Sequence, residues 1–163
     1  MLQKEPLVKR ITSSLTFLEV YVSTMCNIHF LDHIGTVDDF FAELLNRIYG
    51  HSLVNLNHSD LNTAAIDYGD KQKRIAVQIT SERYKSEIQK TLDVFSKHGL
   101  SQDYDALKIL IVGRRKGNYS DLKVPQGIKF SGKDDVIDIE GLVEEISLLD
   151  IDKIKEIDAF VQN

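Results

Sequence analysis

Apolar side chains recur at helical spacing along residues 7–30. Four of them form one stripe: Leu15, Leu18, Val22 and Met25. This spacing predicts an amphipathic helix. The apolar face is wider than one stripe requires, since it also includes Phe17, Val20 and Tyr21. The surplus predicts contact with a second subunit or a neighbouring domain, so residues 1–34 are expected to serve packing or dimerisation; a deep core position is the alternative.

The pattern then predicts a second helix and a three-stranded meander. Thr36 followed three residues later by Asp39 resembles a capping box that starts a helix, and Gly50 ends it. Extended runs at 52–57, 62–68 and 73–80 are separated by the turn-rich connectors HSDL and GDKQK. Sequential strands joined by short turns form an antiparallel meander.

After residue 80 the period returns to that of a helix. Residues 81–99 place Tyr84, Ile88, Leu92 and Phe95 on one face, with Ser81 as the expected cap and Gly99 as the stop. The apolar run ALKILIVG predicts a strand covered on both faces. Short strands are expected at 127–130 (GIKF) and 135–139 (DVIDI), and one or two helices close the chain. This order predicts an α/β fold with a mixed sheet.

Composition indicates one soluble domain. The chain has 163 residues, of which 42% are hydrophobic and 28% charged, and this is ordinary for a globular protein that buries about two-thirds of its unfolded surface. We expect a cytoplasmic protein without a membrane partner, since no signal peptide or apolar span is evident. A single cysteine, Cys26, excludes an internal disulfide. The net charge of −5 disfavours broad coating of nucleic acid but allows a local basic cleft.

Polar residues in the hairpin at 66–80 suggest a metal site. A phosphodiesterase that uses magnesium needs hard oxygen ligands, which Asp67 and Gln78 would provide from adjacent strands. The alternative for Asp67 is a turn-stabilising carboxylate, although Asp70 is the more turn-like of the two. Gln78 would converge with Asp67 if it shares a face with Thr80, or it faces solvent.

Glu43 is the acidic residue in the latter part of the second helix. It lies beside the buried stripe formed by Phe40, Leu44 and Ile48, so it would reach a metal from the side of the sheet. The alternative is a solvated helix face or an ion pair with Arg47 at i+4.

Together, FFAELLNRIYG, SLVNLN, AAIDYGD and IAVQITS resemble the PD-(D/E)xK restriction-endonuclease-like superfamily in its Mrr-like form. More closely, IDYGDKQKRIAVQITSERYKSEIQKTLDVF followed by YDALKILIVG resembles the SMEK domain of bacterial multidomain proteins from predicted defence systems. The resemblance spans roughly residues 38–113. It implies a restriction-endonuclease-like core and the activity of a metal-dependent nuclease. The implied partner is nucleic acid, with DNA expected rather than RNA. The resemblance also implies that further domains accompany this one in a longer chain.

The resemblance also implies roles for individual residues. It assigns Mg²⁺ or Mn²⁺ binding to Glu43, Asp67 and Gln78, and it places Thr80 where the family motif has a catalytic lysine. Threonine carries no positive charge. Lys85 in the following helix is the expected replacement, with Arg83 as the weaker candidate; a site without activity is the other outcome.

The segment RRKGNYSDLK follows the predicted central strand. Arg114, Arg115, Lys116 and Tyr119 would contact phosphates and stack on a base, or they form a solvated surface loop. Two hypotheses follow from the sequence. The first is a metal-dependent nuclease effector; the second is an inactive nuclease-fold domain that senses nucleic acid or forms a homodimer through its first helix.

Overall fold

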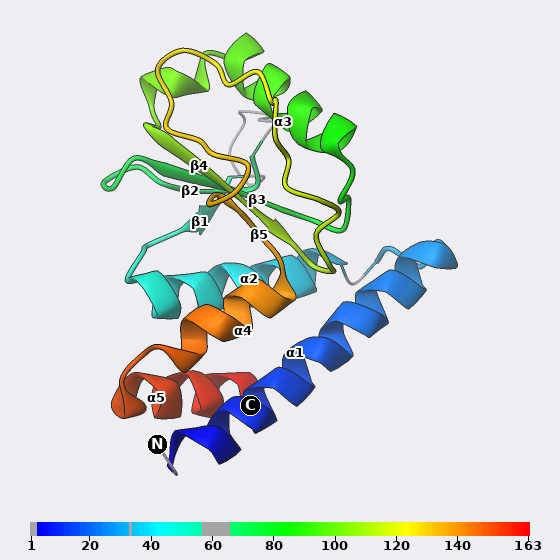
Figure 1. Cartoon of the computed structure of the whole chain (residues 1–163), viewed down its shortest axis with the longest axis vertical. Coiled ribbons are helices and arrows are strands. Elements are labelled where there is room, and N and C mark those ends of the chain that lie inside the picture. Colours follow the sequence, from blue (N-terminus) through cyan, green and yellow to red (C-terminus); the bar gives the residue numbers. More distant parts are fainter. Residues whose placement is uncertain (1–2, 33, 57–65) are drawn as a thin grey trace.

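The computed structural model describes residues 3–32, 34–56 and 66–163. Within these ranges the protein is an α/β fold in which a mixed sheet lies between two helical layers (Figure 1). The predicted class and the predicted mixed sheet are both confirmed. Among the described residues, no helix is both long enough and apolar enough to cross a bilayer.

The sheet has five described strands in the order β1-β2-β3-β4-β5. The strands are β1 (Val54–Asn55), β2 (Tyr68–Asp70), β3 (Ile75–Thr80), β4 (Ala106–Ile111) and β5 (Val136–Ile137). The first three pair antiparallel as the predicted meander, while β4 pairs parallel with β3 and β5 parallel with β4. β4 is therefore an interior strand, and the burial of four of its six side chains explains why its sequence is apolar apart from Lys108.

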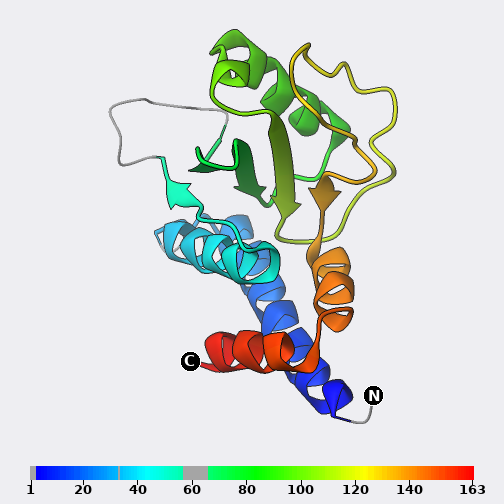
Figure 2. The same cartoon turned by 90° about the vertical axis from the view of Figure 1, so that its left-hand side faces the viewer.

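Six helical elements surround the sheet in the described part of the chain. They are α1 (Lys4–Asn27), α2 (Ile34–Tyr49), α3 (Lys85–Lys97), the short 3-10 helix η1 (Leu100–Gln102), α4 (Ile139–Ser147) and α5 (Ile151–Gln162). Figure 2 shows α1, α2, α4 and α5 on one side of the sheet, and α3 with the long loop after β4 on the other. The side chains of Asp138 and Asp150 cap α4 and α5 by accepting from backbone N–H groups.

Each layer has its own hydrophobic core. On the side of α1 and α2, Val77 and Ile79 of β3 pack with Leu15, Leu44 and residues of α4 and α5. On the side of α3, Ala76 of β3 packs with the buried stripe predicted for that helix: Ile88, Leu92 and Phe95. Alternate residues of β3 thus point to opposite cores.

Several element boundaries differ from the predictions. α2 begins at Ile34, so Gly35 lies inside the helix, and Gly50 ends it with a positive φ of 69°. α3 begins at Lys85 with Tyr84 before it, so Ser81 does not cap this helix. The strand expected at 127–130 is one bridge between Ala106 and Lys129. Residues 58–61 and 62–65, where a connector and the start of a strand were predicted, lie outside the described residues.

Candidate functional site

Asp67 lies in the bend immediately before β2. The register that pairs Tyr68 with Val77 places Asp67 opposite Gln78 of β3. The backbone N–H of Asp67 donates to the Val77 carbonyl at 3.2 Å, and its Oδ2 accepts from the Ile79 N–H at 3.3 Å. The hairpin therefore brings two of the predicted metal ligands to the same level of the sheet.

The turn of this hairpin is held by Asp70. Its Oδ1 accepts from the Lys73 N–H at 3.0 Å and its Oδ2 from the Ser52 N–H at 2.8 Å. These backbone hydrogen bonds lower the pKa of Asp70, because they stabilise the ionised carboxylate. The turn-stabilising role proposed as the alternative for Asp67 thus belongs to Asp70, and Asp67 sits at the other end of β2.

A third acidic residue, Asp38 of α2, lies close to Asp67. Burial raises the pKa of Asp38 to about 7, and repulsion from Asp67 and then from Asp39 adds to the effect. Two carboxylates held near each other in a partly desolvated place are unfavourable unless a proton or a cation lies between them. The two crowded carboxylates would therefore be stabilised by a positive charge bound between them at this edge of the sheet.

Asp39, the neighbour of Asp38, is already engaged. Its Oδ1 accepts from the Tyr68 hydroxyl at 2.5 Å and from the Asn55 side chain at 3.1 Å. Burial raises the pKa of Tyr68, with the hydrogen bond to Asp39 as the second cause, so the phenol stays protonated as the donor. Asp39 therefore ties α2 to the start of β2 and thereby positions Asp38.

Glu43 lies on a different flank of α2. It is exposed, its carboxylate pairs with Arg47 at 3.4 Å, and Arg47 also pairs with Glu156 of α5 at 3.1 Å. The i, i+4 ion pair weighed as the alternative for Glu43 is confirmed. In this structure the α2 carboxylate beside Asp67 is Asp38 rather than Glu43.

Gln78 and Thr80 share the face of β3 that looks toward α3, because the residues between them belong to the opposite core. The predicted alternation is confirmed. The Oε1 atom of Gln78 is buried and has no hydrogen-bond partner among the described residues. A buried acceptor without a partner lowers the stability of the folded state by about 1–3 kcal/mol. A hydrogen-bond donor or a cation bound to this amide oxygen would remove that penalty. Thr80 uses its Oγ1 to accept from the Glu82 N–H at 3.0 Å, and this fixes the turn before α3.

A pocket of about 250 Å³ opens beneath Gln78 and Thr80, between β3 and α3. Its walls are formed by Gln78, Thr80, Glu82, Glu87, Ile88, Lys90, Thr91 and Val94. The cation among these described wall residues is Lys90. Lys85, the replacement expected from sequence, is exposed at the start of α3 and forms none of these walls. Five residues of helix turn the two side chains roughly 140° apart.

The basic segment after β4 is built into the fold. Arg114 pairs with Glu19 at 3.0 Å and with Glu140 at 2.9 Å. The guanidinium of Arg115 donates to the carbonyls of Gly132 and Lys133 at 2.9 Å and also to that of Val136. Both arginines therefore have structural partners in this conformation.

Tyr119 is also structural. Its ring is 4% exposed and lies under Arg115, while its hydroxyl donates to the Arg83 carbonyl at 2.6 Å. A ring buried in this way is not available to stack on a base. Lys116 is exposed, with its Nζ 4.3 Å from the ring centre of the half-exposed Tyr84. Of the four residues predicted to bind nucleic acid, Arg114 and Lys116 are exposed, and Lys116 is the one for which no ion pair with a described carboxylate is found.

The arrangement offers oxygen ligands at an open edge of the sheet. Within residues 3–32, 34–56 and 66–163, no three His, Cys, Asp or Glu side chains gather closely enough to hold a metal ion. Asp38 and Asp67 supply two carboxylates, and the Gln78 amide lies opposite Asp67 in the hairpin register but on the face of β3 that looks toward α3. Sequence reasoning missed Asp38, although it lies four and seven residues before the buried Ala42 and Leu45 and thus on the same helix face. It also missed Lys90, which no spacing marks.

Comparison with known proteins identifies the family. The family model of the SMEK domain matches residues 10–147. No curated protein and no solved structure matches the chain. The matched range covers most of the chain, including α2, the β2–β3 hairpin and α3. The chain therefore belongs to the SMEK domain family.

Proposed function

We propose that this SMEK domain is a metal-dependent nuclease effector with a restriction-endonuclease-like core, acting on phosphodiester bonds. The observation that carries the proposal is the buried Oε1 atom of Gln78, which lies opposite Asp67 and has no hydrogen-bond partner within residues 3–32, 34–56 and 66–163. Buried polar atoms without a partner call for an explanation, and a bound ion at this position would be one. The order of helix, meander, helix and parallel strand supports the proposed core.

The residues present fit a hard divalent cation. Asp38, Asp67 and Gln78 would hold Mg²⁺ or Mn²⁺, because carboxylate and amide oxygens are the ligands such ions prefer. The crowding of Asp38 against Asp67 supports this fit, since a cation would relieve it. When bound, such an ion supplies charge stabilisation at the phosphate and acidifies a water molecule.

The other side chains of the site bind and orient. Asp39 and Tyr68 hold α2 against β2, so that Asp38 faces Asp67. Lys90 would contact a phosphate oxygen from the α3 side of the pocket and supply the positive charge that Thr80 lacks. Lys116 would contact the nucleic-acid backbone farther out, with DNA as the proposed substrate.

The first test combines metal titration and cleavage. Calorimetric titration of Mg²⁺ and Mn²⁺ into the wild-type chain should show saturable binding, and Asp67→Asn should remove it while circular dichroism stays unchanged. With single-stranded and duplex DNA, Asp67→Asn and Asp38→Asn should each lower cleavage at least 100-fold. Glu43→Gln is the matched control and should retain activity, because Glu43 pairs with Arg47.

Lys90 has its own test within the same helix. Lys90→Ala should lower kcat at least 100-fold, while Lys85→Ala, which removes an exposed lysine outside the pocket walls, should lower it less than threefold. Equal activity of the two variants would remove Lys90 from the site without affecting the assignment of Asp67. A deficit only in KM would make Lys90 a binding residue.

A second function is favoured by one observation. Thr80 occupies the position of the motif lysine and uses its hydroxyl for a local turn, which suits a domain of this fold that has lost catalysis and binds nucleic acid or protein. In that case no divalent ion raises the melting temperature, and Asp67→Asn leaves binding unchanged. Saturable metal binding together with cleavage would reject this second function.

A further inference from the structure

An exposed aromatic side chain lies among cations at the start of α3. Tyr84 directly precedes this helix and is 50% exposed. Arg83 and Lys116 are exposed as well. Within the described part of the chain, neither of these two cations forms an ion pair with a carboxylate. Aromatic rings next to cations that are free to meet phosphates are the means by which proteins bind single-stranded nucleic acid.

The buried Tyr119 holds these residues together. Its hydroxyl accepts from the Lys116 N–H at 2.9 Å and donates to the Arg83 carbonyl at 2.6 Å. One hydroxyl thus ties the loop after β4 to the segment between β3 and α3. Because both backbones are fixed in this way, the three exposed side chains belong to one surface. We call Arg83, Tyr84 and Lys116 the platform.

The contact within the platform is of a kind that a nucleotide can replace. The Nζ atom of Lys116 lies 4.3 Å from the ring centre of Tyr84. A cation–π contact at an exposed site is weak. A nucleotide offers each partner a substitute, since a base would stack on the ring and a phosphate would pair with the ammonium group. The exchange leaves neither the ring nor the cation without a partner.

The platform adjoins the pocket of the candidate site. Tyr84 follows two residues after Glu82, which is part of the pocket wall beneath Gln78 and Thr80. Two residues of chain span at most about 7 Å. The hydrogen bond of 3.0 Å from the Glu82 N–H to the Thr80 hydroxyl fixes the start of this segment. A strand held on the platform would therefore continue along the pocket.

We propose that the platform binds an unpaired stretch of single-stranded DNA, with one base stacked on Tyr84 and its flanking phosphates held by Arg83 and Lys116. This inference names the substrate class of the candidate site and rests on the proposed function. Bases within a duplex are stacked on each other, so an unpaired base is needed to cover the Tyr84 ring. The stacking role that the sequence predicted for Tyr119 is thereby assigned to Tyr84, while Tyr119 holds the platform in place.

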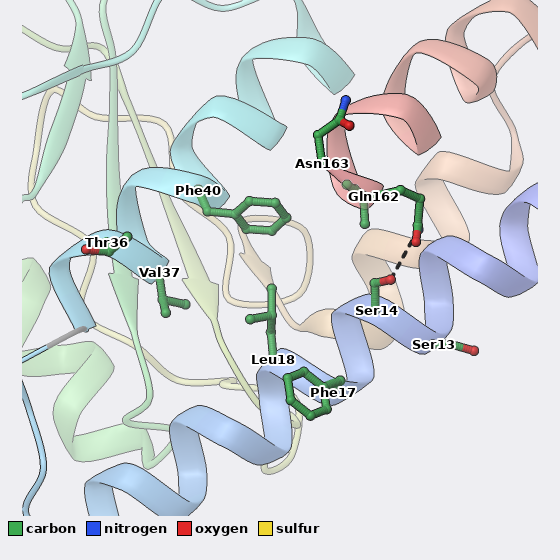
Figure 3. A pocket seen from close by; sticks show the side chains of 10 residues that line it. Ser13, Ser14, Phe17, Leu18, Thr36, Val37, Phe40, Gln162 and Asn163 are labelled. Carbon is green, nitrogen blue, oxygen red and sulfur yellow. Dashed lines mark hydrogen bonds between the residues drawn. The ribbon is translucent and has the colours of Figure 1, made fainter.

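A second exposed aromatic residue, Phe17 of α1, provides a control. It is 68% exposed and borders a groove of about 610 Å³ between α1, α2 and α5. Figure 3 shows Phe17 projecting from α1 below Phe40 and Val37 of α2. Every described side chain that lines the groove is uncharged. Without a cation to hold a phosphate, Phe17 is not expected to bind a single strand.

The first test reports on base stacking directly. The chain has no tryptophan, so Tyr84→Trp introduces a single indole reporter. Binding is measured in EDTA, which prevents metal-dependent cleavage. A single strand of about 12 nucleotides should quench the indole emission, whereas an abasic strand of the same length and a blunt duplex should leave it unchanged. Phe17→Trp is the matched control, and its emission should not respond to any of the three.

The second test separates the ring from the cations. By fluorescence anisotropy in EDTA, Tyr84→Ala should weaken binding of the base-carrying strand at least fivefold and leave binding of the abasic strand unchanged. Tyr84→Phe keeps the ring and should bind within about twofold of wild type. Arg83→Ala should weaken binding of both strands by the same factor, because a phosphate contact does not depend on the base. Circular dichroism should show that every variant is folded.

Two results would overturn the proposal. One is equal affinity of the wild type and Tyr84→Ala for the base-carrying strand. The other is a Tyr84→Trp emission that the abasic strand or the duplex quenches as strongly as the single strand does, since charge alone would then explain binding. Both results are independent of metal. Cleavage without quenching would reject the platform and leave the nuclease, whereas quenching without metal binding or cleavage would support the platform and reject the nuclease.

Discussion

Two polar regions of the molecule, the one around Asp67 and the segment after β4, differ in how completely their buried polar groups are hydrogen-bonded. At the edge of the sheet, Asp38 is crowded by Asp67, and the Gln78 Oε1 atom is buried without a partner in the described structure. In the segment after β4, Arg115 donates to three carbonyls and the Tyr119 hydroxyl both accepts and donates. The sequence suggests a function for both regions. In the part of the chain that the structure describes, the first region keeps one buried acceptor without a partner, whereas Arg115 and Tyr119 of the second have partners.

This difference helps to distinguish polar residues of a binding site from polar residues that stabilise the fold. A folded protein satisfies most of its buried polar groups, and a group left unsatisfied usually has a functional cause. Residues such as Arg115 that meet all of their partners within the chain mainly stabilise it. The comparison therefore predicts that substitutions in the segment after β4 lower stability, whereas substitutions at the sheet edge raise stability or leave it unchanged while they abolish binding.

The largest expected effect on stability belongs to Arg115. Arg115→Ala removes the donor from three backbone carbonyls and the cation from the face of Tyr119. Charge-assisted hydrogen bonds and unpaired carbonyls of this kind together account for about 3 kcal/mol. Urea unfolding monitored by circular dichroism should show this loss. Arg114→Ala, which breaks an exposed ion pair with Glu140 and a partly buried one with Glu19, is the comparison and should cost less than Arg115→Ala, about 1 kcal/mol.

Substitution of Asp38 should raise the free energy of unfolding, whereas substitution of Arg115 should lower it. The folded pKa of about 7 lies above the unfolded value, so between roughly pH 4 and 7 the folded chain keeps a proton that the unfolded chain has lost. Wild-type stability contributed by this group therefore falls as the pH rises through that window. Asp38→Asn avoids the loss and should be about 2 kcal/mol more stable than wild type at pH 8, and equal to it near pH 4.

Asp39→Asn is the control for that substitution. Asp39 accepts from Tyr68 and Asn55, so its replacement should destabilise the protein by about 1 kcal/mol at pH 8. Stabilisation by Asp39→Asn, or destabilisation by Asp38→Asn, would contradict the view that only Asp38 is crowded. Thermal unfolding at pH 4, 6 and 8 would measure both the stabilisation by Asp38→Asn and the destabilisation by Asp39→Asn.

Metal affinity should depend on pH for the same reason. A cation binds the ionised form of Asp38, so the apparent affinity for Mg²⁺ should fall about tenfold for each pH unit below 7. Titrations in two buffers with different ionisation enthalpies should show release of a proton on binding at pH 6. Binding that is independent of pH from 5.5 to 8 would exclude Asp38 as a ligand and leave Asp67 to be tested alone.

The fold follows from sequence where the pattern is long. The buried stripe Ile88, Leu92 and Phe95 and the apolar run of β4 are correctly predicted, because each repeats its period over several turns or residues. The strands expected at 52–57 and 135–139 are present but have only two residues each, as β1 and β5, and the strand expected at 127–130 is a single bridge at Lys129. Their pairing is decided by neighbours distant in the chain.

The part of the candidate site that can be predicted from sequence is the part formed by residues close together in the chain. The hairpin places Asp67 opposite Gln78 because strand pairing fixes register over a short turn. The positions of Asp38 and Lys90 depend on how α2 and α3 cross the sheet, which sequence does not show. The choice between Glu43 and Asp38 is an example, since both are acidic residues of one helix and only the packing of α2 shows which one meets Asp67.

The smallest expected effect is that of Lys116, an exposed residue of the basic segment whose Nζ lies 4.3 Å from the ring centre of Tyr84. Lys116→Ala should change the free energy of unfolding by less than about 0.5 kcal/mol. If the lysine contacts a phosphate, the same substitution should weaken DNA binding and reduce the slope of log affinity against log salt by about one. Fluorescence anisotropy between 50 and 200 mM salt measures both. Lys123→Ala, on the same loop, controls for net charge; an equal effect of the two variants would show that charge alone, and not the position of Lys116, explains the binding.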